Sequence, residues 1–216
     1  MPTREHPSNL SNRRSRRPTA AERREEILSE GLRCFAARGF NGTTTRRIAE
    51  SVGITEAALY RYFRSKESLY SAIVARKIET PLLFDRAEDA ARRRDDTAVF
   101  TALASGVLKG GTADPEFLRL LFFTALESHE LAAPLFASHV DPLREFVTDY
   151  VRMRIAEGAF RPIDPLLGAR AFLGMIRDYL NVRIVHGESE AYPQSLDEVV
   201  ATFVDLFLTG VRADPR

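Results

Sequence analysis

The sequence predicts an all-α protein with a small N-terminal helical domain and a larger C-terminal helical domain. Apolar residues recur at helical spacing between proline and glycine breaks along most of the chain. No alternating strand pattern and no internal repeat is present. Residues 1–80 hold 16 Lys and Arg against 9 Asp and Glu, net +7, whereas residues 81–216 hold 15 against 21, net −6. The basic part is therefore expected to meet a polyanion.

The composition restricts the class of protein. The chain has 216 residues, of which 44% are apolar, and this is enough for a globular core. No apolar run approaches the about 18 residues that a membrane span needs. The arginine-containing N-terminus lacks the apolar stretch of a secretory signal. Cys34 is the single cysteine, which excludes a disulfide within the chain. We therefore expect a cytoplasmic protein with no membrane contact.

Residues 1–18 are predicted to form a disordered basic tail, because they are polar and contain four closely spaced arginines, Arg13, Arg14, Arg16 and Arg17. Such a tail can follow DNA phosphates or enter a minor groove. It can equally be a solvated leader with no role, and both interpretations remain open.

The first predicted helix opens the N-terminal domain, which we place at residues 19–66. Thr19 and Glu22 have the spacing of a capping box, in which each side chain binds a backbone N–H at the helix start. Apolar residues then follow at helical spacing as far as Gly39, which is expected to end the helix in a left-handed conformation.

Two short helices joined by a glycine turn follow. The second helix begins near Thr44 and carries apolar residues on one face up to Val52. Gly53 supplies a residue that tolerates positive φ at the turn. Thr55 can cap the third helix, which continues through Tyr60. This layout is that of a helix-turn-helix.

The C-terminal domain is placed at residues 67–216. A helix from about 67 to 79, capped by Ser65, connects it to the first domain. Asp114, Pro115 and Glu116 form a strong helix start. The following FLRLLFFTAL is apolar almost all round, so this helix is expected to be central and buried.

The last two helices carry more apolar residues than one domain can bury. The final helix starts with a second capping box at Ser195 and Glu198, and the preceding helix runs from Pro165 to about His186. Together they predict a four-helix homodimer interface, although core packing alone is the alternative. The predicted interface residues are Phe172, Ile176, Leu180, Ile184, Val200, Phe203, Val204 and Phe207.

The segment GFNGTTTRRIAESVGITEAALYRYFRSKESLYSAIV resembles the DNA-binding domain of the TetR (tetracycline-repressor-like) family of bacterial transcriptional regulators. The resemblance covers about Thr19 to Lys77, and no diagnostic motif follows. It implies a regulator, in the first instance a repressor, that binds a palindromic double-stranded DNA operator as a homodimer. It further implies a C-terminal domain whose small-molecule effector releases the DNA.

The predicted DNA contacts divide by chemistry. Hydroxyl, phenol and ammonium groups can hold the phosphate backbone, and these belong to Thr45, Thr55, Tyr60, Tyr62 and Lys66. Arginine forks, a carboxylate and methyl groups can read base edges, and these belong to Arg46, Glu56, Ala57, Ala58 and Arg61. The two alanines offer little side-chain readout. They therefore support an alternative function, a low-specificity architectural or protein-interaction protein.

The effector pocket is predicted from aromatic and flexible side chains of the C-terminal domain, which favour an apolar or aromatic ligand. The candidates, each of which also fits plain core, are Phe84, Phe100, Phe117, Leu121, Met153, Phe172, Met175 and Tyr179. No catalytic or metal-binding constellation is present in the sequence. An enzyme is therefore not expected, and no cofactor is predicted.

Overall fold

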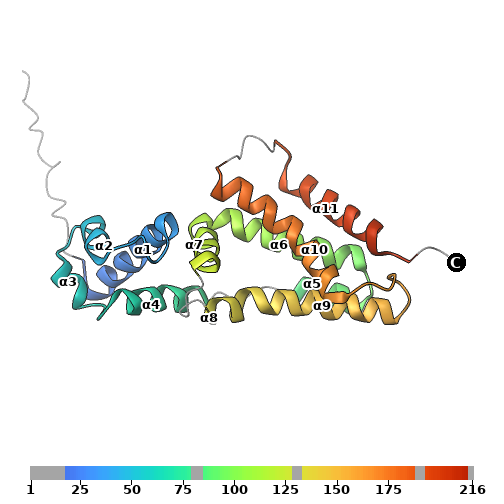
Figure 1. Ribbon diagram of the computed structural model, residues 1–216, viewed down its shortest axis with the longest axis horizontal. Coiled ribbons are helices and arrows are strands. Elements are labelled where there is room, and N and C mark those ends of the chain that lie inside the picture. The colour runs from blue at the N-terminus through green and yellow to red at the C-terminus, as the bar shows by residue number, and fades with distance from the viewer. Residues whose placement is uncertain (1–17, 79–84, 128–132, 188–192, 214–216) are drawn as a thin grey trace, which may run out of the picture.

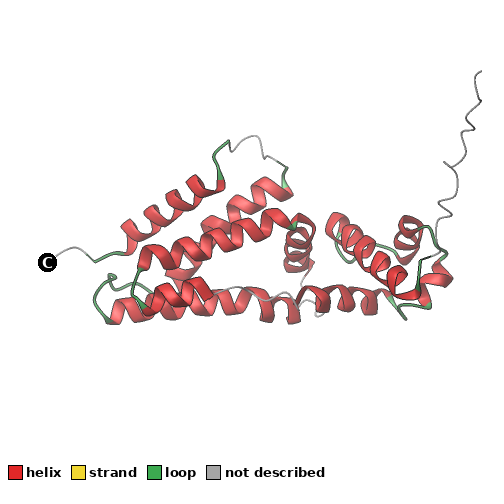
Figure 2. Cartoon of the chain, turned by 180° about the vertical axis from the view of Figure 1, so that it is seen from behind, coloured by secondary structure: helices red, strands yellow, loops and turns green. Residues whose placement is uncertain are grey.

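The structure, a computed structural model, describes residues 18–78, 85–127, 133–187 and 193–213 (Figure 1). Its described residues are helical apart from short connections and one isolated bridge between Phe160 and Arg212, as Figure 2 also shows. The predicted all-α fold class is confirmed. The α-helices are α1 (Ala20–Arg38), α2 (Thr45–Val52), α3 (Glu56–Tyr60), α4 (Lys66–Ile78), α5 (Asp85–Arg92), α6 (Asp96–Ala113), α7 (Pro115–Glu127), α8 (Ala133–Leu135), α9 (Asp141–Ala156), α10 (Pro165–Leu180) and α11 (Leu196–Val211).

In the N-terminal domain α1 packs against α2 and α4, and α3 packs against α2. The predicted capping box is present, since Thr19 accepts from the Glu22 N–H and Glu22 accepts from the Thr19 N–H at 2.6 Å. Gly39 ends α1 with φ of 71°, a positive value as predicted, but its ψ of 178° lies outside the left-handed helical region. The buried side chains of α4 belong to this core, which comprises Ile27, Leu28, Leu32, Phe35, Phe40, Ile48, Leu59, Leu69, Tyr70 and Ile73 among others.

The C-terminal core is built around Phe100 of α6. Its ring lies 4.8 Å from Phe172 of α10 and 4.7 Å from Phe207 of α11, measured between centroids. Phe172 and Phe207 are 5.2 Å apart, so three helices meet in one aromatic cluster. Aromatic pairs of this kind add about 0.5–1.5 kcal/mol beyond the burial of their area.

Helix α7 lies between the two domains (Figure 1). Phe117, Leu120 and Leu121 pack with the N-terminal core, whereas Leu118 packs with the C-terminal core. The predicted central position is confirmed, but only Leu120 and Thr124 are fully buried. Contact with two cores therefore explains part of the apolar circumference of this helix, whereas Leu126 is 81% exposed.

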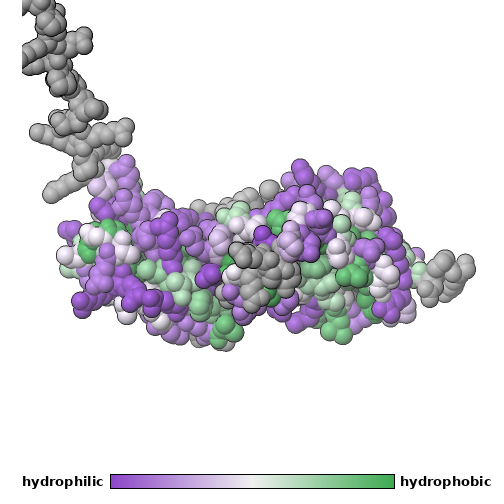
Figure 3. Space-filling view, turned by 90° about the horizontal axis from the view of Figure 1, so that it is seen from above, coloured by the Kyte–Doolittle hydropathy of each residue, from purple (hydrophilic) through white to green (hydrophobic). Residues whose placement is uncertain are grey.

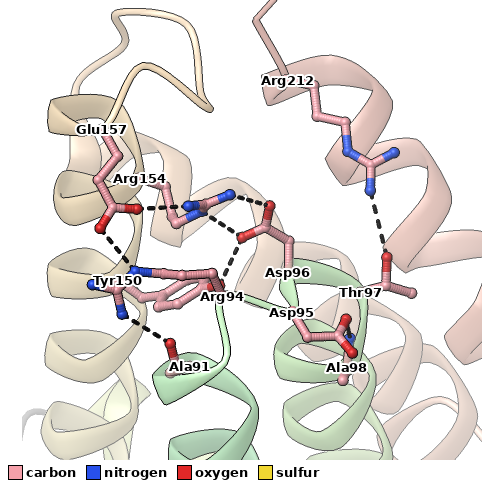
Figure 4. A network of polar contacts seen from close by, with 10 residues as sticks. All are labelled: Ala91, Arg94, Asp95, Asp96, Thr97, Ala98, Tyr150, Arg154, Glu157 and Arg212. Carbon is pink, nitrogen blue, oxygen red and sulfur yellow. Dashed lines mark hydrogen bonds and ion pairs between the residues drawn. The ribbon is translucent and has the colours of Figure 1, made fainter.

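A polar network fastens the loop between α5 and α6 to α9 (Figure 4). Asp96 accepts from the guanidinium of Arg154 at 2.7 and 3.0 Å and from the Tyr150 hydroxyl at 2.6 Å. Glu157 accepts from Arg154 at 2.6 Å and from Arg94 at 2.8 Å. Burial and the adjacent Asp96 raise the pKa of Tyr150. Arg94, the non-glycine residue with positive φ among those described, is held at φ 60° by this network.

Candidate nucleic-acid interface

The turn between α2 and α3 has the geometry that a DNA reader needs. Gly53 adopts φ 74° and ψ 35°, as predicted for the turn. The hydroxyl of Thr44 accepts from the Arg47 N–H at 3.2 Å and so caps α2. The hydroxyl of Thr55 caps α3 by accepting from the Ala58 N–H at 3.2 Å, as predicted. Because caps of this kind stabilise helix starts, two short helices keep defined ends at the protein surface.

Three predicted DNA contacts form one network across the two helices. The Thr45 hydroxyl at the start of α2 donates to the carboxylate of Glu56 at the start of α3. The same hydroxyl lies 3.3 Å from the Tyr60 hydroxyl, which belongs to an exposed side chain. The network fixes the carboxylate of Glu56 in position. The Thr44 hydroxyl already accepts from the Arg47 N–H, so the N–H groups of Thr45 and Arg46 are the first-turn donors of α2 that could meet a phosphate.

The remaining base-reading candidates lie beside this network. Arg46 is 80% exposed, and its Nε lies 3.0 Å from a carboxylate oxygen of Glu50 one turn along α2. Arg61 and Ala57 are exposed, and Ala58 is half-buried. Arg46, Ala57 and Arg61 are therefore exposed at the surface, and their contacts with base edges stay predictions.

Lys66 and Tyr62 lie differently from the exposed candidates. The ammonium of Lys66 donates to the carbonyl oxygens of Phe40 at 2.9 Å and Thr43 at 3.0 Å, and it lies 4.1 Å from the centre of the Phe40 ring. Tyr62 is half-buried against the N-terminal core. The structure thus gives Lys66 an internal role, because its ammonium supports the loop that precedes α2. Its contact with DNA stays a prediction.

The same loop is held from the other side by α7. The carboxylate of Glu127 accepts from the backbone N–H groups of Phe40 at 2.8 Å and Asn41 at 3.2 Å. One turn earlier on α7, the Thr124 hydroxyl lies 2.5 Å from the buried hydroxyl of Tyr70 on α4. Sequence reasoning missed these contacts. Partners 54 to 87 residues apart leave no pattern in the sequence.

The predicted effector residues do not gather at one place. Phe100, Phe172 and Tyr179 are buried in the C-terminal core, and Met153 and Met175 pack against it half-buried. Phe117 and Leu121 instead pack against the N-terminal core. Phe84 lies outside the described residues, as does the predicted tail except Pro18. The described candidates therefore belong to two separate cores, and an effector pocket lined by them stays a prediction.

The predicted dimer residues lie on the inner faces of α10 and α11, except Ile184, which lies in the helical segment after α10. Six of them are at most 5% exposed within the single chain, namely Phe172, Ile176, Leu180, Val200, Val204 and Phe207. Ile184 and Phe203 are half-buried on the same core. Exposed leucines occupy the outer faces instead, with Leu167 at 65% and Leu206 at 59%. Figure 3 shows hydrophobic patches between hydrophilic ones at this end of the molecule.

Two features of other classes of protein are absent from the described part of the chain. No helix there is long and apolar enough to cross a bilayer. No cluster of three or more His, Cys, Asp and Glu side chains able to hold a metal occurs among the described residues. The α2–turn–α3 unit with its exposed reading residues is that of a helix-turn-helix DNA-binding protein.

Two family models match the chain. Residues 27–73 match bacterial regulatory proteins of the tetR family, and residues 112–210 match the C-terminal domain of AefR-like transcriptional repressors. The second match lies in the region where the sequence showed no diagnostic motif.

Curated relatives and solved structures agree with these matches. The transcriptional repressor AcnR of Corynebacterium efficiens is 30% identical over 194 residues, which cover 88% of this chain and 92% of the relative. The nucleoid occlusion factor SlmA of Haemophilus ducreyi is 31% identical over 153 residues, covering 68% and 74%. The structure of AibR with isovaleryl coenzyme A and operator DNA has a TM-score of 0.60 at 22% identity, covering 86% and 97%. The chain belongs to the TetR family. It is a DNA-binding transcriptional regulator, and not an enzyme.

Proposed function

We propose that the protein is a cytoplasmic homodimeric repressor that binds a palindromic operator and is released by a small ligand. The observation that carries the proposal is the reading surface, where the Thr45–Glu56–Tyr60 network and the exposed Arg46 lie on two capped helices. Repression is supported by the similarity to AcnR and to the AefR-like C-terminal domain.

The reading surface supports a division of labour at the DNA. The N–H groups of the first turn of α2 and the Tyr60 hydroxyl suit phosphate oxygens. Arg46 and Arg61 suit guanine, and the fastened Glu56 carboxylate suits the amino group of cytosine or adenine. Thr55, Tyr62 and Lys66 remain proposed backbone contacts, and Ala57 and Ala58 remain proposed methyl contacts.

The dimer is proposed to form through the outer faces of α10 and α11, which carry the exposed leucines Leu166, Leu167 and Leu206. A second copy would cover these apolar groups without disturbing the core. The inner-face residues, including Phe203 and Ile184, then act by holding the two helices in position. Two readers carried by one dimer would contact half-sites about one helical turn apart, or a multiple of that.

The ligand is proposed to act through α7, because this helix joins both cores. The half-buried Met153 and Met175 are flexible side chains beside the C-terminal core and suit an apolar ligand. The AibR structure, which contains an acyl thioester, supports an acyl group as the apolar part. A ligand that displaces α7 would move Glu127, and with it the loop that leads into α2. The ligand changes DNA binding only if its affinity differs between the arrangement with α7 in place and the arrangement with α7 displaced.

Selection from a random duplex library at moderate salt tests the proposal. We expect a two-fold symmetric consensus, a footprint over both half-sites and binding that weakens steeply with salt. Binding with no enriched sequence would reject the operator-specific repressor.

The second candidate is a DNA-binding protein of low specificity that acts through other proteins. The specific observations are the short Ala57 and Ala58 side chains on α3 and the similarity to the nucleoid occlusion factor SlmA. The library selection separates the two functions: a sharp palindrome supports the repressor, and a diffuse consensus supports this candidate.

A further inference from the structure

A cleft of about 540 Å³ lies at the junction of the two domains, away from the reading surface. Its walls come from α1, from the first turns of α7 and from the segment after α10. Ala36, Ala37, Pro115 and Ile184 give it an apolar lining, and three arginines, Arg33, Arg119 and Arg183, add positive charge. Its volume lies within the range of about 300–1,000 Å³ that small-molecule sites occupy.

Arg119 is the most informative of these arginines. Its guanidinium is half-buried and donates to the carbonyl oxygen of Ile184 at 2.6 Å. No carboxylate of the described residues forms an ion pair with it. A carbonyl satisfies one N–H donor but leaves the charge uncompensated, and a guanidinium has five such donors in a fork that suits carboxylates and phosphates. The cleft therefore has a positioned cation without an anionic partner.

Arg33 supplies a second cation that can change partners. Its Nη1 pairs with the carboxylate of Glu30 one turn earlier on α1, and its Nε lies 3.5 Å from the carboxylate of Glu116 across the cleft. The side chains of Arg33 and Glu116 are about half exposed. An exposed ion pair of this length contributes little to stability. An anion that enters the cleft can therefore replace Glu116 as the partner of Arg33 at small cost.

We propose that this cleft binds an amphipathic organic anion, whose carboxylate or phosphate contacts Arg119 and Arg33 and whose apolar part covers Ala37 and Pro115. The site is separate from the ligand site proposed above beside the C-terminal core. A ligand here touches α1 of the DNA-binding domain and α7 of the other domain at once. It replaces the ion pair between Arg33 of α1 and Glu116 of α7 and so alters the contact between these two helices.

Calorimetric titration of the full chain with sodium octanoate tests the site, because octanoate combines a carboxylate with an apolar tail. We expect one binding site per chain. Neutral 1-octanol and inorganic phosphate should each bind at least tenfold more weakly, a difference of about 1.4 kcal/mol. Equally tight binding of octanol would show that the arginines are not used, and equally tight binding of phosphate would show that the apolar lining is not used. Either result, or no binding of octanoate, overturns the proposal.

Substitutions locate the binding. Arg119→Gln should weaken octanoate binding at least tenfold, and Ala37→Phe should abolish it by filling the cleft. Arg177→Gln, an exposed arginine of α10 that does not line the cleft, should leave it unchanged. Where circular dichroism shows that Arg119→Gln does not fold, Arg33→Gln takes its place, since that side chain is 59% exposed. Unchanged binding in the folded cleft variants overturns the proposal.

The titration requires no DNA, so its result is independent of the proposed repressor function. Binding of octanoate in the cleft together with a diffuse DNA consensus would keep the site and reject the repressor. A sharp operator together with no octanoate binding would do the reverse.

Discussion

Replacement of Arg46 by alanine should weaken DNA binding without weakening the fold. The side chain is 80% exposed, and its contact in the structure is the pair with Glu50, itself 63% exposed, at a spacing of four residues. Such helix-surface pairs contribute about 0.3–0.5 kcal/mol. Alanine also has the higher helix propensity. The free energy of unfolding should therefore change by less than about 0.5 kcal/mol.

The effect on DNA should be several times larger. A bidentate contact to guanine is worth about 1–3 kcal/mol, so the dissociation constant for the operator should rise by a factor of about 5 to 150. Fluorescence anisotropy with labelled operator duplex at two or more salt concentrations measures it. If Arg46 reads a base, the variant also loses discrimination at one position. If it holds a phosphate, affinity falls for all sequences and the salt slope decreases by about one.

Arg152→Ala is the matched control. Arg152 is an exposed arginine of α9 that pairs with Asp149 at a spacing of three residues, far from α2 in the chain and on the C-terminal domain. Its loss removes the same charge and a similar ion pair, and operator affinity should stay within about twofold. The reasoning is refuted if Arg46→Ala binds operator like the unmodified protein, or if both substitutions weaken binding equally.

Four further substitutions test the domain junction, the two faces of α11 and the polar network. Glu127→Gln should lower the free energy of unfolding by about 1–2 kcal/mol in urea and change operator affinity. The neutral amide keeps one acceptor oxygen, so one of the two hydrogen bonds that the Glu127 carboxylate accepts from the loop is lost. Leu206→Glu should yield a folded monomer in sedimentation, whereas Phe207→Ala should lower the free energy of unfolding by about 3–5 kcal/mol. A dimeric Leu206→Glu variant, or a Phe207→Ala variant with unchanged stability, would contradict the assignment of the two faces. Folded Tyr150 holds its proton more tightly than the unfolded chain, so its contribution is complete below about pH 10 and lost above it. Tyr150→Phe should therefore lose less stability between pH 8 and pH 10.5 in urea titrations than the unmodified protein, and equal losses would exclude this role.

Local signals in the sequence were sufficient for the helices and their ends. The capping boxes at Thr19 and Ser195, the cap at Thr55 and the positive φ of Gly53 all occur as predicted. Each depends on residues within three or four positions of one another, and short-range hydrogen bonds and sterics decide them. The helix-turn-helix was readable for the same reason.

The sequence did not show which helix covers the apolar face of another helix. The apolar circumference of the last helix predicts a dimer contact through Phe203 and Phe207, yet Phe207 contacts Phe100 of α6 and Leu206 faces outward. An amphipathic pattern shows that a helix has an apolar face, but it does not show which other helix covers it. The same limit applies to the effector candidates: Phe117 packs against the N-terminal core and Phe172 lies in the C-terminal core, and the helical pattern does not distinguish the two.

The sequence by itself determined the helical fold class, the DNA reader and the family, because hydrophobic periodicity, caps and turn glycines are local properties. Tertiary structure alone decided how the reader is held. Glu127 at the loop before α2, Thr124 at Tyr70 and the cleft beside Arg119 join residues that are far apart in the chain. Such contacts depend on the packing of α7 between two cores, and that packing is a property of the whole chain rather than of any segment.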